Sequence, residues 1–396
     1  MNSRTNTPSP QKVLIFGSAM HVWSDLFFAL LVPLLPHIKE ELNLSYTSIG
    51  LLRSVYNGSS AILQIPAGLV AESTGEFWML LGGNIWVGSG LIVMAVVPGF
   101  LPLIGATALG GLGGGTQHPL ASSMVSRAYN SAGRSAAVGT VNFSGDIGKM
   151  MAPIVAGLLV MLGGWRATMW IVGAVGSAFM CMSVFTRRHF DMGKPLVEHS
   201  PEERDSENSS ETSTIVGFIV LSGIGILDSA TRSSTLVFFP FIFVERGMGE
   251  SGVGIALFLL FAGGAAGKYI CGWLDDRTGT LPLIWATKGM TTTLIVSAIF
   301  VPSLILWPLA IILGVGLNGT SSVLYATVAK FIPPNKRARY YGLFYTTNEI
   351  GTVGAPLGYG LIADMIGLNR SVIIMGVVTA TILPASLALR RYLTAN

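Results

Sequence analysis

Isolated ionisable side chains interrupt the long apolar stretches of this chain. A charge inside hydrocarbon costs a few kcal/mol or more, so each of these side chains must face a cavity or a partner of opposite charge. The carboxylates and the strong bases balance, which leaves both explanations open. The positions are the carboxylates Asp25, Asp146, Asp228 and Glu349, the bases Arg53, Lys149, Arg232 and Lys268, and the histidines His21 and His118.

His21 and Asp25 are four residues apart, so they lie on one face of a helix. A carboxyl group beside an imidazole can exchange a proton near neutral pH. The alternative is a buried hydrogen-bonded pair that fixes this helix against a neighbour. We therefore treat both residues, together with Asp146 and Glu349, as candidates for binding a coupled proton.

Arg53 shares a helix face with Tyr56 and Asn57. Its guanidinium offers forked donors that match a carboxylate or a phosphonate. Alternatively, this arginine reaches the lipid interface or pairs with Asp25. His118 precedes a proline and either ends a hydrogen-bonded stretch of helix or lines a cavity. All four polar residues are candidates for ligand contact.

A similar pattern of polar and small residues occurs twice in the sequence. Residues 144–159 read SGDIGKMMAPIVAGLL, and residues 347–362 read TNEIGTVGAPLGYGLI. The small residues favour close helix contact, and each proline favours a bend. The carboxylates serve either a site or gate, or the loop ends near Arg134 and Arg337. The stripes are Asn142, Asp146, Lys149 and Pro153, and Tyr345, Glu349, Thr352 and Pro356.

Asp228 and Arg232 are a further pair four residues apart. They either neutralise each other along one helix face or contact a ligand. With Asn142, Lys149 and Tyr345 they complete the set of residues that we expect to line a ligand-binding site.

The composition points to a bilayer as the solvent. Hydrophobic residues make up 51% of the 396 residues and charged residues 11%, with a mean hydropathy of +0.62, whereas soluble domains are about 25% charged. Apolar runs of about 20 residues, enough to cross hydrocarbon, recur throughout. We predict an all-α integral membrane protein with twelve transmembrane helices at 13–36, 46–70, 76–97, 101–128, 134–162, 165–187, 214–243, 250–273, 281–301, 304–331, 337–366 and 369–392.

The basic residues indicate the orientation. The first apolar run is too long for a signal-peptide core and shows no convincing cleavage site, so we place the N-terminus in the cytoplasm. Of the 24 basic residues, sixteen then lie on the cytoplasmic side and four outside, as the positive-inside rule requires. The basic pI of about 9.1 is thus a topology signal and does not indicate a nucleic-acid partner. Both cysteines lie in predicted helices, which disfavours a disulfide.

The chain reads as a duplication. The charged, Ser-rich stretch 188–213 predicts a cytoplasmic linker between two six-helix halves, residues 1–187 and 214–396. Shifting the second half back by 203 or 204 positions aligns the two Ala-Pro pairs and several other motifs. Two halves of the same topology, related by a pseudo-two-fold axis, are typical of secondary transporters with a substrate site near mid-membrane.

The loop GWLDDRTG at 272–279 is similar to the loop motif of the major facilitator superfamily. Its counterpart at 68–75, GLVAESTG, is a degenerate copy. The resemblance implies a gating role for Asp275, Asp276 and Arg277. Within that superfamily, HVWSDLFFALLVPLLP (21–36) and GLGGGTQHPLASSMVSR (111–127) resemble the fosmidomycin-resistance type of transporter.

We therefore expect a proton-coupled secondary transporter in the plasma membrane. The alternative is an uncoupled facilitator of the same fold. The intramembrane cations favour a small organic anion or zwitterion, and the family resemblance permits a drug-like molecule, with efflux favoured. Motifs of nucleotide-driven pumps and of common hydrolases are absent from the sequence, so we do not expect an enzyme. We expect a monomer whose partners are its substrate, protons and lipid, without a cofactor or metal.

The orientation can be tested with single cysteines at positions 206 and 247, in a background lacking the two native cysteines. A membrane-impermeant thiol reagent applied to intact cells should label the protein with Gly247→Cys and leave the one with Ser206→Cys unlabelled. The opposite pattern would reverse the topology.

Overall fold

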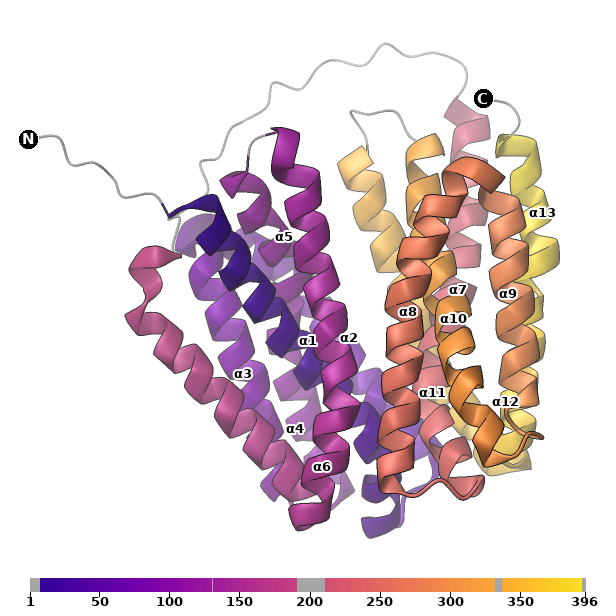
Figure 1. Ribbon diagram of the computed structural model, residues 1–396, viewed down its shortest axis with the longest axis horizontal. Helices are drawn as coiled ribbons and strands as arrows, with labels where there is room; N and C mark the ends of the chain where they lie inside the picture. Colours follow the sequence, from indigo (N-terminus) through magenta and orange to yellow (C-terminus); the bar gives the residue numbers. More distant parts are fainter. Residues whose placement is uncertain (1–7, 130, 191–210, 332–336, 394–396) are drawn as a thin grey trace, which may run out of the picture. The chain divides into compact units, whose positions relative to one another are not determined.

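The computed structural model describes residues 8–129, 131–190, 211–331 and 337–393, and every regular element in these ranges is a helix (Figure 1). The all-α class predicted from the composition is therefore confirmed. The α-helices are α1 (Pro10–Glu41), α2 (Tyr46–Thr74), α3 (Glu76–Val96), α4 (Phe100–Leu112), α5 (Gln117–Ala128), α6 (Ser131–Phe185), α7 (Glu211–Glu245), α8 (Glu250–Thr278), α9 (Thr280–Ser297), α10 (Ser303–Phe331), α11 (Arg337–Ile366), α12 (Leu368–Ala380) and α13 (Ile382–Leu393), with short 3-10 helices η1 (Gly113–Thr116) and η2 (Arg187–His189).

These elements correspond to the twelve predicted spans. The 3-10 turn η1 joins α4 and α5 into one span, and α12 continues into α13. Helix α6 holds two spans, because Gly163 and Gly164 leave the helical conformation and Gly164 has a φ of +72°, which glycine adopts without steric cost. Seven described stretches are long and apolar enough to cross a membrane, and one of them, Ala136–Phe185, runs through this break.

The chain divides into two compact units. One comprises Met1–His37 and Val55–Ser200, and the other comprises Ile38–Ser54 and Pro201–Asn396. The end of α1 and the start of α2 thus group with the second unit. The linker boundaries 188 and 213 stay a prediction, because residues 191–210 lie outside the described residues.

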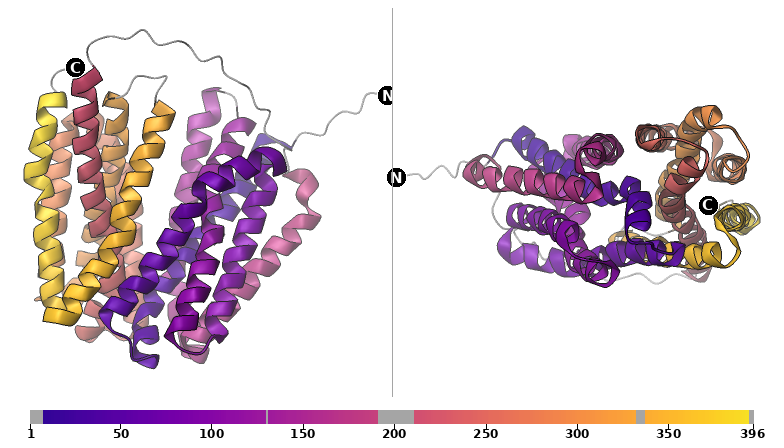
Figure 2. Two further views of the ribbon diagram at one scale, coloured as in Figure 1. Left: turned by 180° about the vertical axis from the view of Figure 1, so that it is seen from behind. Right: turned by 90° about the horizontal axis from the view of Figure 1, so that it is seen from below.

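Each unit has its own apolar core. In the first unit, α3 packs on α6 and α4, and the rings of Phe16 and Phe77 stack with centroids 4.8 Å apart. In the second unit, α8 packs on α10 and α7 on α11, around a cluster that includes Phe344. The end-on view shows most helices of the second unit, orange to yellow, running roughly parallel (Figure 2).

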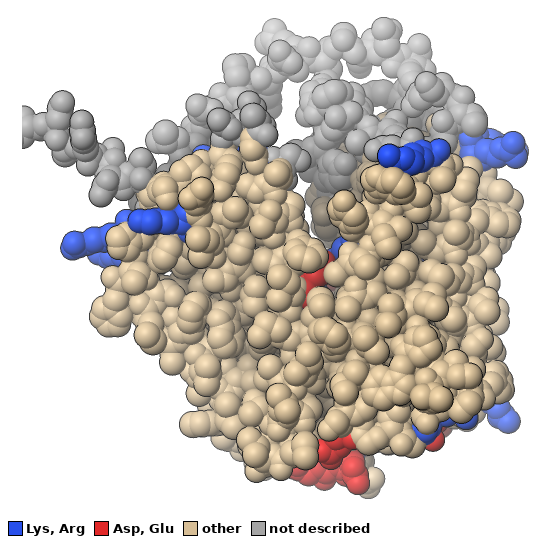
Figure 3. All heavy atoms as spheres, in the orientation of Figure 1, with Lys and Arg blue, Asp and Glu red and all other residues tan. Residues whose placement is uncertain are grey.

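The surface of the second unit carries Lys and Arg near its two ends, with an uncharged band between them (Figure 3). Exposed apolar side chains such as Trp273, Trp285 and Ile312 belong to the helices of this unit. Such a band is expected where lipid replaces water around a helix bundle.

The glycine of the repeated Ile-Gly sequence makes the same contact in both units. A Cβ atom on Gly148 of α6 would overlap the carbonyl oxygen of Val22 in α1, and one on Gly351 of α11 would overlap that of Ile226 in α7. Both members of each contact are displaced by the offset of 203 or 204 that aligns the two halves. The duplicated motif therefore marks a duplicated helix crossing.

A carboxylate from α11 holds the N-terminus of α2. Asp364 accepts hydrogen bonds from the backbone N–H groups of Tyr46 and Thr47, each 2.8 Å long, and from the Thr47 hydroxyl at 2.5 Å. The first N–H groups of a helix lack partners within the helix, and negative charge is favoured beside them. This contact helps to attach Ile38–Ser54 to the second unit.

The crossing glycines predict a stability difference. Gly148→Ala and Gly351→Ala should each lower the free energy of unfolding by about 1–3 kcal/mol, because the added methyl group displaces a packed backbone. Matched controls lie nine residues earlier at Gly139 and Gly342, where a Cβ atom meets nothing within 4 Å. Thermal unfolding of detergent-purified variants provides the measurement, and equal melting temperatures in both pairs would contradict the crossing.

Candidate functional site

Lys149 in the first unit lies between two carboxylates. Its Nζ is 3.0 Å from Asp25 Oδ2 and 3.4 Å from Asp146 Oδ1. The Nε2 of His21 lies 3.6 Å from the same Asp25 oxygen. Helix α1 supplies His21 and Asp25, and α6 supplies Asp146 and Lys149. The two carboxylates and His21 are buried, whereas the Lys149 side chain is 33% exposed.

Two glycines let α6 approach this pair. A Cβ atom on Gly145 would overlap the Asp25 carboxylate and crowd the His21 ring, and Gly148 lies against α1 one turn further on. Ser144 also donates from Oγ to the Ser18 carbonyl at 3.2 Å. The sequence predicted that His21 and Asp25 share one face of a helix. The structure shows in addition that Lys149 and Asp146 of α6 lie beside them.

Two carboxylates of this cluster, Asp25 and Asp146, contact the one ammonium group of Lys149. Because an unpaired charge is costly inside an apolar bundle, these contacts stabilise the burial of the charged groups.

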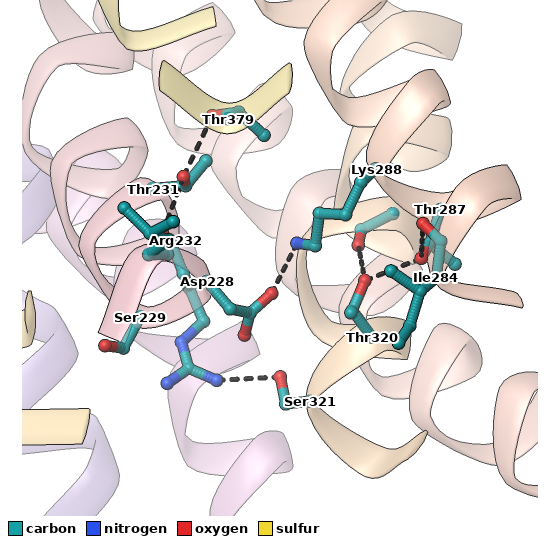
Figure 4. A network of polar contacts seen from close by, with 12 residues as sticks. Asp228, Ser229, Thr231, Arg232, Ile284, Thr287, Lys288, Thr320, Ser321 and Thr379 are labelled. Atoms are coloured by element: carbon teal, nitrogen blue, oxygen red, sulfur yellow. Dashed lines mark hydrogen bonds and ion pairs between the residues drawn. The ribbon is translucent and has the colours of Figure 1, made fainter. Parts of the chain in front are cut away.

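The second unit contains a different ion pair (Figure 4). Asp228 of α7 forms a salt bridge with Lys288 of α9, and the two residues are 2% and 0% exposed. Arg232 instead donates from Nη1 to Ser321 Oγ of α10 at 2.9 Å. Throughout the described residues, the Arg232 guanidinium has no carboxylate within the 4 Å of an ion pair. Of the two alternatives for this pair, mutual neutralisation of Asp228 and Arg232 is therefore wrong, because Asp228 pairs with Lys288.

Lys288 did not stand out in the sequence. It lies eight residues into α9, where a lysine can also extend along the helix to the membrane surface. Neither its spacing from Asp228, 60 residues away, nor a local motif indicates the pairing. Only the tertiary packing shows it, because α10 and α12 each contact both α9 and α7 and so bring Lys288 within reach of Asp228.

Hydroxyl groups link the helices around this pair. The hydroxyls of Thr231 and Thr379 lie 2.9 Å apart, and those of Thr287 and Thr320 lie 2.6 Å apart. Ser229 donates to the backbone carbonyl of Asn348 at 2.6 Å. The helix that carries Arg232 is thereby tied to α12 and α11.

Glu349 is half-buried on α11 and interacts electrostatically with Arg232, although no ion pair joins them. The exposed Tyr345 stacks on Tyr325 of α10, with ring centroids 4.5 Å apart. Glu349, Arg232 and Tyr345 therefore belong to one region of the second unit.

Other predicted contact residues lie elsewhere. Tyr56 is buried and stacks on Phe28 at 4.3 Å, while Arg53 and Asn57 are half-buried on α2. Asn142 is exposed and donates to the Val138 carbonyl at 3.1 Å. The side chain of His118 lies outside the described part of the structure.

The stretch predicted as a gating loop is helical in the structure, because Asp275, Asp276 and Arg277 lie at the end of α8. Asp275 is buried and accepts a hydrogen bond from Thr280 at 3.0 Å, whereas Arg277 is exposed over the ring of Trp273. The side chain of Asp276 lies outside the described residues.

The degenerate loop of the first half is followed by an ion pair that the sequence reasoning missed. Glu76 accepts from Arg127 of α5 at 2.6 Å and from Ser123 at 2.8 Å. Glu76 directly follows the motif copy at 68–75. This position beside the motif is the feature of the sequence that could have indicated the ion pair.

A search of the described residues finds no cluster of three or more His, Cys, Asp or Glu side chains able to hold a metal ion. The two cysteines, Cys181 and Cys271, are both free.

Comparison with known proteins identifies the family. A model described as Major Facilitator Superfamily matches residues 18–221 and 221–394. The fosmidomycin resistance protein of Escherichia coli (strain K12) is 23% identical over 360 residues, covering 88% of this chain and 85% of that protein. A probable 4-methylmuconolactone transporter of Cupriavidus pinatubonensis is 23% identical over 374 residues, covering 92% and 86%.

A similar fold occurs among solved structures. A bacterial homologue of the human lysosomal transporter Spinster, in an inward-facing and occupied conformation, matches with a TM-score of 0.82 at 17% identity, covering 96% of both chains. The family match along nearly the whole sequence confirms the family that the sequence motif indicated. The chain belongs to the major facilitator superfamily and is an integral membrane transporter of small molecules.

Proposed function

We propose that this transporter couples the movement of a small organic anion or zwitterion to a proton. The observation that supports the proposal is the cluster formed by His21, Asp25, Asp146 and Lys149. Two buried carboxylates share the ammonium group of Lys149, and the His21 ring lies 3.6 Å from the same Asp25 oxygen, so a proton on Asp25 would compete with Lys149.

The proton would change a helix contact. With both carboxylates ionised, Lys149 binds Asp25 on α1 and Asp146 on its own helix. Protonation of Asp25 removes the ionic attraction between α1 and α6 and leaves Lys149 paired within α6. The close crossing at Gly145 and Gly148 transmits any such change to both backbones, because little space separates them. The partly exposed Lys149 side chain marks the open side of the cluster.

The substrate class rests on the cations and on the relatives. Fosmidomycin is a phosphonate and 4-methylmuconolactone carries a carboxylate, and both names occur among the relatives. Arg53 and Arg232 supply the forked donors that such groups bind. A drug-resistance relative supports efflux as the direction. The remaining contact candidates are Tyr56, Asn57, His118, Asn142, Asp228 and Tyr345.

An uncoupled facilitator of the same fold is the second candidate. Half-buried Arg53 and Arg232 suit it equally well, because a binding site for an anion does not require a proton. Transport into vesicles separates the two. Only a coupled carrier accumulates substrate against its concentration when a pH gradient is imposed.

The arrangement in the membrane forms part of the proposal. We propose a monomer in the plasma membrane with both termini and the linker 188–213 in the cytoplasm, as the distribution of basic residues supports. The motif residues Asp275, Asp276 and Arg277, at the end of α8, would then lie on the cytoplasmic side and act in gating.

The proton role of Asp25 can be tested in proteoliposomes. Asp25→Asn should abolish accumulation driven by a pH gradient while substrate exchange continues, because the variant keeps its shape but cannot titrate. Ser24→Ala, a change at the buried neighbouring residue, is the control and should retain both activities. Full accumulation by Asp25→Asn would show that this carboxylate is structural.

The substrate class can be tested by ligand-induced stabilisation of the purified protein. Fosmidomycin and 4-methylmuconolactone should raise the melting temperature, and a lipophilic cation such as tetraphenylphosphonium should not. Arg53→Ala should weaken anion binding about ten- to hundredfold, since a charge-assisted hydrogen bond contributes about 1.5–3 kcal/mol. Stabilisation by the cation alone would rule out the anion class.

A further inference from the structure

In the polar network of the second unit, two cations, Lys288 and Arg232, lie near the carboxylate of Asp228. This carboxylate forms a salt bridge with Lys288 and not with Arg232. Asp228 and Arg232 stand one turn apart on α7, a spacing at which carboxylate and guanidinium ordinarily pair. In the structure the Asp228 carboxylate points to Lys288, and the Arg232 guanidinium extends to Ser321 (Figure 4). Asp228 thus pairs with a residue of another helix and not with the arginine on its own helix.

The pair of Asp228 and Lys288 is buried and fixed from both sides. Neither residue is more than 2% exposed. Thr287, next to Lys288, contacts Thr320 of α10, and Thr231, between Asp228 and Arg232, contacts Thr379 of α12. A buried pair of this kind is costly to break, because the remaining ion has no water to solvate it.

Arg232 keeps most of its hydrogen-bonding capacity. A guanidinium has five N–H donors, and the described residues offer Arg232 one hydrogen-bond acceptor, Ser321 Oγ. Asp228 is occupied, and Glu349 stands beyond ion-pair distance. Arg232 is also only half-buried, unlike Lys288. Arg232 therefore keeps donors to which no carboxylate among the described residues is bound, and these can serve a ligand.

We infer that Lys288 is a positioning residue that occupies Asp228 and thereby keeps the Arg232 guanidinium available to hold the anionic group of the substrate. The substrate part of this inference rests on the proposed function. The part that concerns Arg232 alone rests on the ion pair.

Removal of the Lys288 ammonium group should change the partner of Arg232. Asp228 would be left buried without a cation, and Arg232 is the charged neighbour at the correct spacing on the same helix. The guanidinium should move onto Asp228 and stop binding external anions. Removing Asp228 as well should release it again, because no buried carboxylate then attracts it.

The state of Arg232 can be measured without knowing the substrate. Phenylglyoxal modifies accessible arginine side chains, and mass spectrometry of the peptide that contains Arg232 gives the rate. Lys288→Met should slow modification of Arg232 about tenfold, which corresponds to about 1.4 kcal/mol. The double variant Asp228→Asn with Lys288→Met should return to the wild-type rate. Lys268→Met, which removes another lysine of the second unit, should leave the rate unchanged.

Unchanged modification of Arg232 in Lys288→Met would overturn the inference. If this variant does not fold, the double variant is decisive, because it must fold and its Arg232 must react at the wild-type rate. A slowed rate in the double variant would equally overturn the inference.

Binding of fosmidomycin supplies a second readout. Its affinity should fall in Lys288→Met and recover in the double variant, in parallel with the modification rate. Recovery would also exclude direct contact between Lys288 and the anion.

If the rates follow the expected pattern but fosmidomycin and 4-methylmuconolactone do not bind the wild type, the proposed substrate class fails while the positioning role of Lys288 stands. Lost binding in a double variant with normal Arg232 reactivity would instead assign Lys288 to the substrate and contradict the inference.

Discussion

The structure depends on the requirement that an ion inside an apolar helix bundle has a counter-ion nearby. Each unit meets this requirement with one lysine, and the lysine joins two helices that are distant in sequence. Lys149 links α6 to α1, and Lys288 links α9 to α7. In the first unit two carboxylates contact the lysine. In the second unit one carboxylate contacts the lysine, and Arg232 lies near Glu349 without forming an ion pair with it.

The duplication preserved the helix contacts and let the charges diverge. Gly148 against Val22 corresponds to Gly351 against Ile226. Among the charged residues of the two clusters, Asp146 aligns with Glu349, whereas at the offsets of 203 and 204 Asp25 aligns with Ser229, Lys149 with Thr352, Asp228 with Ser24 and Lys288 with Asn84. A close backbone crossing cannot accept a side chain, whereas an ion pair can be replaced by hydrogen-bonding residues once both charges are lost. One scaffold therefore supports two different polar clusters.

The sequence was sufficient for features that are local along the chain. Apolar length predicted the spans, and the four-residue spacing placed His21 beside Asp25. The same reasoning failed for Asp228, because spacing on one helix does not show which residue of another helix competes for the carboxylate. Lys288 and Asp364 both act on helices distant in sequence, so only the packing reveals them. The roles of Arg53 and His118 stay predictions, and the side chain of His118 lies outside the described residues.

The contact between Asp364 and the start of α2 has a consequence for dividing the chain. Residues 38–54 precede the linker in sequence but pack with the second unit. Two polypeptides encoded separately on either side of the linker would each lack part of a packed neighbourhood. The first would carry backbone amides at Tyr46 and Thr47 without their carboxylate, and the second would carry Asp364 without those donors. Association of the two fragments would restore all three hydrogen bonds. Residues 38–54 would therefore favour reassembly of the separated fragments.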